Sequence, residues 1–235
     1  MILLGTFRSW AQGGPPMLTD DPGTPGNGKW EINIADVTQF TSQTVSQFPY
    51  SDINYGWGDH VQLKYESALN SVSSQTMPVG GSQAIVGVKW RFFDEESDGV
   101  DVSMYPQYQF TPSYIANNPA NGQSSFFLPI ELSKKFGEIT LNPEVGYSFQ
   151  YGGGYGFWVV GVLADHEFDK KFEIMVEVFA DIGTAANETE TLFNLGGRYN
   201  WNEVLTFLFS AGLSLQTPPD IPTMQFSYLG LQLHL

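Results

Sequence analysis

The residues in this chain best suited to chemistry are three histidines and the acidic side chains near them. His60, His166 and His234 could act as general bases beside a nucleophilic serine, as in hydrolases. His166 stands between Asp165 and Glu167, which could suggest a metal site. Because successive residues of a strand point to opposite faces, these three side chains cannot converge on one ion. The sequence therefore predicts no metal site at this position.

A run of glycines, Gly152–Gly154, could suggest a loop that binds a phosphate group. No helical pattern follows the run to present backbone amide groups, so it indicates a tight turn instead. The sequence offers no residue set for a nucleotide or another cofactor, and we expect the protein to need none.

Apolar and polar residues alternate through most of the chain. Between Phe172 and Ile182 every second residue is apolar, whereas Glu173, Glu177 and Asp181 occupy positions on the other face. Strict alternation predicts β-strands with two chemically different faces. When many segments of about ten to fourteen residues do this, the apolar face is expected to contact lipid and the polar face a lumen. The predicted fold class is therefore all-β, a transmembrane antiparallel up-and-down β-barrel.

We predict about twelve strands, within the even-numbered range of bacterial outer-membrane barrels. They span residues 29–41, 46–56, 59–69, 82–93, 99–110, 124–136, 138–151, 155–168, 171–183, 190–201, 203–216 and 223–235. Very short turns alternate with longer polar segments, as in barrels with short periplasmic turns and long outer loops. An even strand number with this alternation predicts that both termini lie on the periplasmic side.

The polar faces of the strands define the candidate functional residues. The predicted lumen-lining set is Glu31, Glu66, Lys89, Arg91, Asp101, Glu131, Glu144, Asp165, Glu173, Glu177, Asp181 and Arg198. Acidic residues outnumber basic ones in this set, and rings of charge in a pore determine its ion preference. Aromatic residues of the same register are candidates for a solute path: Tyr50, Tyr105, Phe127, Phe179 and Tyr228. Alternatively, the charges pair with one another in a plugged interior and the aromatic rings only fill space.

Composition excludes several classes of protein. The sequence has no run approaching the roughly 18 apolar residues of a membrane helix. A net charge of −15 argues against binding nucleic acid, which requires a basic surface. The absence of cysteine rules out a disulfide framework and thiol catalysis. A soluble β-sandwich that binds a ligand is an alternative to a membrane barrel, although it does not account for charges on the second face of most strands.

Prolines interrupt three consecutive predicted strands. Pro106, Pro129 and Pro143 lie well inside the fifth, sixth and seventh strands. Proline cannot donate a hydrogen bond to the ladder and is normally confined to edges or bulges. We therefore expect the ladder to be interrupted there, with locally unpaired carbonyl groups.

The residues before the first strand resemble the opening of a known family. Gly14-Pro15-Pro16-Met17-Leu18-Thr19-Asp20-Asp21-Pro22-Gly23-Thr24 precedes a glycine-bearing turn and the strand residues Lys29-Trp30-Glu31. This pattern resembles the bacterial outer-membrane family named after the MetA pathway of phenol degradation, whose members tend to begin with Pro-x-x-Thr-Asp-Asp. The resemblance extends to Gly56–Leu63, Val145–Tyr147 and Asn194–Tyr199. It implies a barrel that transports small hydrophobic or aromatic compounds, and it supplies no catalytic residue.

Two domain-level units are predicted, an N-terminal segment over residues 1–28 and a barrel over residues 29–235. Residues 1–12 could be the remnant of a signal peptide, and the rest of the segment a periplasmic extension or a plug. The last segment, Gln225–Leu235, alternates as a final strand does in barrels recognised by the outer-membrane insertion machinery. It ends in Leu235 and not in the typical terminal aromatic residue.

The predicted function is passage of small molecules across the bacterial outer membrane through a narrow acidic lumen. A hydrolase on such a barrel would need its serine and base on the lipid side near the outer leaflet. By strand register, the three histidines fall near the periplasmic rim instead, so we expect no catalytic residue. The expected partners are the lipid bilayer, a small-molecule solute and the insertion machinery. The alternative within the membrane is a structural or adhesive barrel with a plugged lumen.

Overall fold

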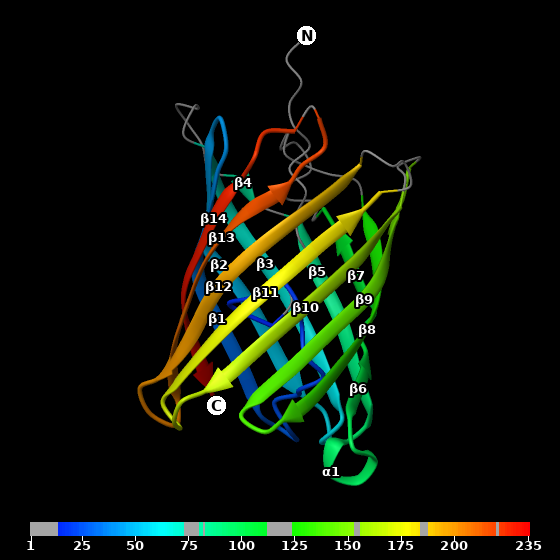
Figure 1. Cartoon of the computed structure of the whole chain (residues 1–235), viewed down its shortest axis with the longest axis vertical. Helices are drawn as coiled ribbons and strands as arrows, with labels where there is room; N and C mark the ends of the chain where they lie inside the picture. Colours follow the sequence, from blue (N-terminus) through cyan, green and yellow to red (C-terminus); the bar gives the residue numbers. More distant parts are fainter. Residues whose placement is uncertain are drawn as a thin grey trace.

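The computed structural model describes residues 14–72, 80–81, 83–111, 124–152, 156–183, 188–219 and 221–235. These residues form tilted antiparallel strands around a central lumen (Figure 1). The strands are β1 (Trp30–Phe40), β2 (Thr44–Gly56), β3 (Val61–Val72), β4 (Gly80–Gly81), β5 (Ala84–Phe93), β6 (Asp101–Met104), β7 (Gln107–Phe110), β8 (Ser125–Phe136), β9 (Ile139–Gln150), β10 (Phe157–Glu167), β11 (Phe172–Ile182), β12 (Thr189–Asn200), β13 (Leu205–Gln216) and β14 (Gln225–His234). Because β4 leads into β5 and β6 into β7 along the wall, the barrel has twelve strands.

Pairing between the first and last strands closes the barrel. β1 and β14 pair from Glu31 opposite His234 to Phe40 opposite Gln225. Backbone hydrogen bonds of 2.8 and 2.9 Å between Trp30 and Leu235 extend this pairing. Closure removes the sheet edges, which is what hydrocarbon demands because it offers no partner for an exposed backbone group. The predicted twelve-stranded barrel is confirmed, and the β-sandwich alternative is wrong.

The two faces of each strand have opposite chemistry. In β11, Val176 and Val178 are exposed on the outer wall, whereas Met175, Glu177 and Phe179 are buried. The same alternation recurs around the barrel and produces an outer apolar surface that faces lipid. Exposed aromatic residues stand beside the short turns: Trp30, Trp57, Phe136, Phe168 and Trp201. Aromatic rings of this kind favour membrane interfaces.

The short turns gather at one end of the barrel, together with the C-terminus and α1 (Glu95–Asp98) (Figure 1). Local chemistry explains two of them. Asp169 Oδ1 accepts hydrogen bonds from the amides of Lys171 and Phe172 at 2.7 and 3.0 Å. Gly137 turns with φ of 68°, a conformation that glycine adopts without strain. In the part of the chain that the structure describes, no helix is long and apolar enough to cross a membrane.

The longer loops predicted for the opposite end lie largely outside the described residues, at positions 73–79, 112–123, 153–155 and 184–187. Residues 1–12, the predicted signal remnant, also lie outside them.

Of the three prolines, Pro106 breaks the predicted fifth strand, whereas Pro129 and Pro143 lie inside the continuous strands β8 and β9. β6 ends and β7 begins around Pro106, and both pieces pair with β8 in one register. The carbonyl groups of Pro106 and Pro129 accept hydrogen bonds from the amides of Val88 and Tyr105 at 3.1 and 3.2 Å. The expected interruption is present at Pro106 and absent at Pro129 and Pro143, and the carbonyl groups of Pro106 and Pro129 are paired.

The lipid-facing assignment predicts a position-specific cost. Val178 lies one residue from the middle of β11 and is 46% exposed. Val178→Arg should lower the free energy of unfolding by roughly 2–4 kcal/mol, because the charge enters hydrocarbon. Val178→Leu, which keeps an apolar side chain, should cost less than about 1.5 kcal/mol. Guanidinium unfolding from lipid vesicles measures both, and equal costs would contradict a membrane-facing wall.

Candidate functional site in the barrel lumen

The predicted lumen-lining residues occupy two environments. Six are buried inside the barrel: Glu66, Lys89, Glu131, Glu144, Glu177 and Asp181. The others are partly buried and lie nearer the end with the short turns: Glu31, Arg91, Asp101, Asp165, Glu173 and Arg198. A buried charge is costly unless it is paired and hydrogen-bonded. The partners of the six buried groups therefore define the site.

Residues 14–28, here called the N-terminal segment, supply many of those partners. The segment runs inside the barrel, where Figure 1 shows it in dark blue. Met17, Leu18, Thr19 and Asp20 are all buried, with exposed fractions between 1% and 6%. Since these residues precede β1, the chain folds back into its own lumen before the barrel wall begins.

Two wall carboxylates hold the backbone of the segment. Glu177 Oε2 in β11 accepts hydrogen bonds from the amides of Leu18 and Thr19, both at 2.8 Å. Glu144 Oε2 in β9 accepts a hydrogen bond from the amide of Asp20 at 2.8 Å. Hydrogen bonds to a charged acceptor are stronger than neutral ones. Three successive amides of the segment are thus bound by acids from two different strands.

Lys89 in β5 provides the matching positive charge. Its Nζ lies 2.9 Å from Asp20 Oδ1 and 3.4 Å from Glu131 Oε2, and it also donates to the carbonyl of Asp21. The Tyr105 ring centroid lies 4.7 Å from the same ammonium. Asp20 is therefore bound through both its amide and its side chain.

Further polar contacts fix the beginning of the segment. Arg198 Nη2 donates to the carbonyl of Pro15 at 3.1 Å, and Ser210 Oγ to that of Pro16 at 2.8 Å. Burial opposes ionisation of Asp21, but Lys89, Arg198 and the amide of Gly23 together lower the pKa of this carboxyl group below its usual value. The negative charge of Asp21 is thus favoured in the folded state.

Apolar packing also holds the segment against the wall. Leu18 belongs to a buried cluster that also contains Phe127, Val159, Phe179, Leu192, Met224 and Phe226. These residues come from β8, β10, β11, β12 and β14 and the turn before β14, so Leu18 packs against one continuous arc of the wall. Met17 packs with Leu163 and Met175 in a second cluster.

The five aromatic residues predicted for a solute path are all buried, and their side chains are packed. Phe127 and Phe179 contact the cluster around Leu18. Tyr50 and Tyr228 lie together with ring centroids 6.2 Å apart. Tyr105 stacks below Lys89. In this conformation the five rings are packed inside the barrel.

A second polar network lies on β2 and β3. Lys64 Nζ lies 3.0 Å from Glu66 Oε2 and 3.6 Å from Asp52 Oδ1. Asn33 and Asn54 donate to Asp52 Oδ2 at 3.2 and 3.1 Å. The candidate set omitted Asp52, Lys64 and the residues of the N-terminal segment. The inward register of Asp52 could have identified it, whereas the lumenal position of the segment has no local signal.

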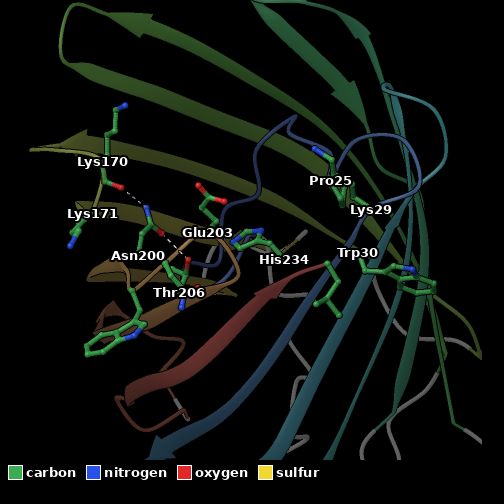
Figure 2. Close-up of a pocket in the computed structure, with 12 residues that line it drawn as sticks. Pro25, Lys29, Trp30, Lys170, Lys171, Asn200, Glu203, Thr206 and His234 are labelled. Carbon is green, nitrogen blue, oxygen red and sulfur yellow. Dashed lines mark hydrogen bonds between the residues drawn. The ribbon is translucent and has the colours of Figure 1, made fainter.

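Two cavities remain beside the segment. One of about 180 Å³ is lined by Asp20, Asp21, Asp52, Lys64, Lys89 and Arg198, among others. The other, about 650 Å³, opens at the end with the short turns (Figure 2). Figure 2 shows Pro25 of the segment, Lys29, Lys170, Lys171, Glu203 and His234 around it. The interior of the barrel is therefore open at this end, and a smaller cavity lies further inside.

The histidines contact groups other than serine. His60 is about half exposed in the β2–β3 turn, with Nδ1 3.4 Å from Asp94 Oδ2. His166 Nδ1 lies 2.8 Å from the carbonyl oxygen of Glu138. His234 lines the open cavity. Within the described ranges, no group of three or more acidic and histidine side chains could hold a metal.

Comparison with solved structures agrees with this architecture. An outer membrane channel from Pseudomonas putida F1 matches with a TM-score of 0.71 at 9% identity, covering 92% of this chain and 98% of that one. The NanC porin matches at 0.65 with 10% identity, and the KdgM porin at 0.59 with 12%; each covers 86% of this chain and 98% of its own. At such identities the likeness concerns the fold. No family model and no curated protein matches the sequence.

The closed barrel, its apolar outer face and these neighbours define the class of protein. The chain is an outer-membrane β-barrel protein of twelve strands. The resemblance to the phenol-degradation family stays a prediction.

The contact between the segment and β10 can be tested at Gly161. A Cβ atom at this position would lie 2.2 Å from Thr19 Oγ1, so a larger residue collides with the Thr19 side chain, and we expect it to displace the segment. Gly161→Val should raise the rate at which a maleimide labels a Leu18→Cys reporter at least tenfold, a shift of about 1.4 kcal/mol in docking. The sequence has no natural cysteine to interfere.

Adding Thr19→Gly removes the colliding atoms and should restore slow labelling. If Gly161→Val leaves the labelling rate unchanged, the segment does not dock against β10.

Proposed function

We propose that this protein is an outer-membrane channel for small solutes whose N-terminal segment closes the lumen in the conformation described above. The observation that supports this most directly is the binding of Leu18, Thr19 and Asp20 to charged side chains of the wall. A segment held by polar contacts to buried groups can leave when water or solute replaces those contacts. A permanently filled barrel would gain more from an apolar interior.

The orientation follows from the turns. The short turns and the C-terminus belong in the periplasm, where bacterial barrels have their short connections. The open cavity beside Lys29, Lys170 and His234 then faces the periplasm. In this orientation the N-terminal segment enters the lumen from the periplasmic side, and β14 is the strand recognised by the insertion machinery.

The lumen is proposed to favour cations and neutral solutes over anions. Its inward carboxylates outnumber its inward basic groups, and ring charge selects ions in a pore. The resemblance noted in the sequence adds small hydrophobic or aromatic compounds as candidate solutes. Phe127 and Phe179, released from Leu18, would offer them a partly apolar path.

A barrel permanently plugged by the segment, with a structural or adhesive role, is the second candidate function. The same contacts around Leu18 and Lys89 favour it if they never break. Current across a membrane separates the two candidates.

Glu177→Gln should open the channel. The neutral amide loses the charge that strengthens hydrogen bonds to Leu18 and Thr19, each worth about 1.5–3 kcal/mol. The open probability in a planar lipid bilayer should rise about 10–100-fold over the parent protein. Glu138→Gln, the same change at an exposed turn residue, should leave it unchanged. If the parent protein, Glu138→Gln and Glu177→Gln all carry no current, the result would support the plugged barrel.

Ion selectivity provides an independent check. Reversal potentials in a salt gradient should show cation preference, and Glu31→Gln together with Asp52→Asn, which line the small cavity, should reduce it. Anion preference of the parent channel would contradict the proposed role of the acidic lumen.

A further inference from the structure

Asp20 contacts an acidic and a basic residue of the wall through two different groups, its backbone amide and its side-chain carboxylate. Its amide N–H donates to Glu144 Oε2 at 2.8 Å, and its carboxylate oxygen Oδ1 lies 2.9 Å from Lys89 Nζ. Asp20, Lys89 and Glu144 are all buried, with exposed fractions of 6%, 2% and 4%. The residue thus joins a lysine and a glutamate that belong to different strands, β5 and β9.

Departure of the N-terminal segment leaves these wall groups without their partners. Glu144 loses the hydrogen bond from the Asp20 amide, and Lys89 keeps Glu131 at 3.4 Å. Glu131 Oε1 is buried and has no hydrogen-bond partner among the described residues, so an acceptor is already present beside the lysine. Water can hydrate these groups, but a solute with complementary charges would satisfy them together.

We propose that Asp20 occupies the binding site of the transported solute, and that this solute is a small zwitterionic amino acid. The inference rests on the proposed channel function and names a solute class for it. An ammonium group would take the place of the Asp20 amide at Glu144, and a carboxylate the place of its side chain at Lys89.

The covalent structure of Asp20 gives the spacing. Its nitrogen and its side-chain carboxylate carbon are separated by the two carbons Cα and Cβ. A 3-amino acid has the same separation between its ammonium and carboxylate groups. A solute that is only cationic or only anionic would satisfy one wall group and leave the other unpaired, which is costly in a buried site.

The route to this site is present beside the segment. The cavity of about 180 Å³ is lined by both Asp20 and Lys89. A cavity of this size holds several waters or a small solute. A small solute in this cavity would lie beside Lys89 and compete with Asp20 for it while the segment is docked.

Competition can be measured without relying on transport. In the folded full-length protein carrying the Leu18→Cys reporter, 3-aminopropanoate should increase the maleimide labelling rate in a saturable way, at least fivefold. A ligand that binds only the undocked state shifts the docking equilibrium toward it. The uncharged analogue of the same length, 3-hydroxypropanamide, should have no effect.

Two variants give opposite expectations. Lys89→Met should abolish the response to 3-aminopropanoate, whereas Asp20→Asn, which weakens the internal competitor, should shift the response to lower concentration. Lys134→Met, the same change at an exposed lysine on β8, should respond as the parent does. If the substitutions only loosened the fold, the response to 3-aminopropanoate would change in the same direction in Lys89→Met and in Asp20→Asn.

Equal responses to the two solutes, no response to 3-aminopropanoate, or an unchanged response in Lys89→Met would overturn the inference. These outcomes leave the channel proposal intact, because that proposal is tested by current through Glu177→Gln. Conversely, absence of current with a normal labelling response would leave a zwitterion-binding barrel that does not conduct.

Discussion

Pairing of buried charge is the constraint on which the interior of this barrel depends. Lys89, Glu131 and Glu177 are at most 2% exposed, and an unpaired charge at such depth costs several kcal/mol. Glu131 of the wall pairs with Lys89, whereas Glu177 accepts hydrogen bonds from the amides of Leu18 and Thr19 in the segment. The chain resolves this by folding its own N-terminal segment into the lumen. Docking of that segment therefore gives Glu177, Glu144 and Lys89 additional polar partners.

The outer wall obeys the complementary constraint. Hydrocarbon offers no hydrogen-bond partner, so the strands must close on themselves and present apolar side chains outward. The pleat of a strand meets both demands at once, since Val178 and Glu177 are neighbours that point to opposite sides. Every strand can therefore present polar side chains to the interior. Acids of β9 and β11 bind the segment while the outer face of the same strands stays apolar.

Much of the fold could be predicted from the sequence because its signals are local. Alternation fixes each strand, and residues such as Asp169 and Gly137 fix the turns between them. The predicted twelve strands correspond to the observed wall, with the strand near residues 99–110 broken at Pro106. The inward register of the charged residues was also local information, although their roles remain proposals.

The sequence left two positions open for the N-terminal segment, a periplasmic extension or a plug, because the contacts that decide between them are long-range. Leu18 and Glu177 are 159 residues apart, and no periodicity links them. Prolines and glycines around Met17 and Leu18 indicate irregular backbone and say nothing about its location. Gly161 on an inward face was one available hint, since a missing side chain permits the close approach of Thr19.

The most direct measurement of the central claim is the single-channel conductance of a chain that lacks residues 14–24. If these residues close the lumen, the shortened protein should insert as a stable twelve-stranded barrel and show long-lived open steps, whereas the full chain opens rarely under the same conditions. Identical conductance and open probability in the two proteins would contradict the claim that the N-terminal segment closes the channel.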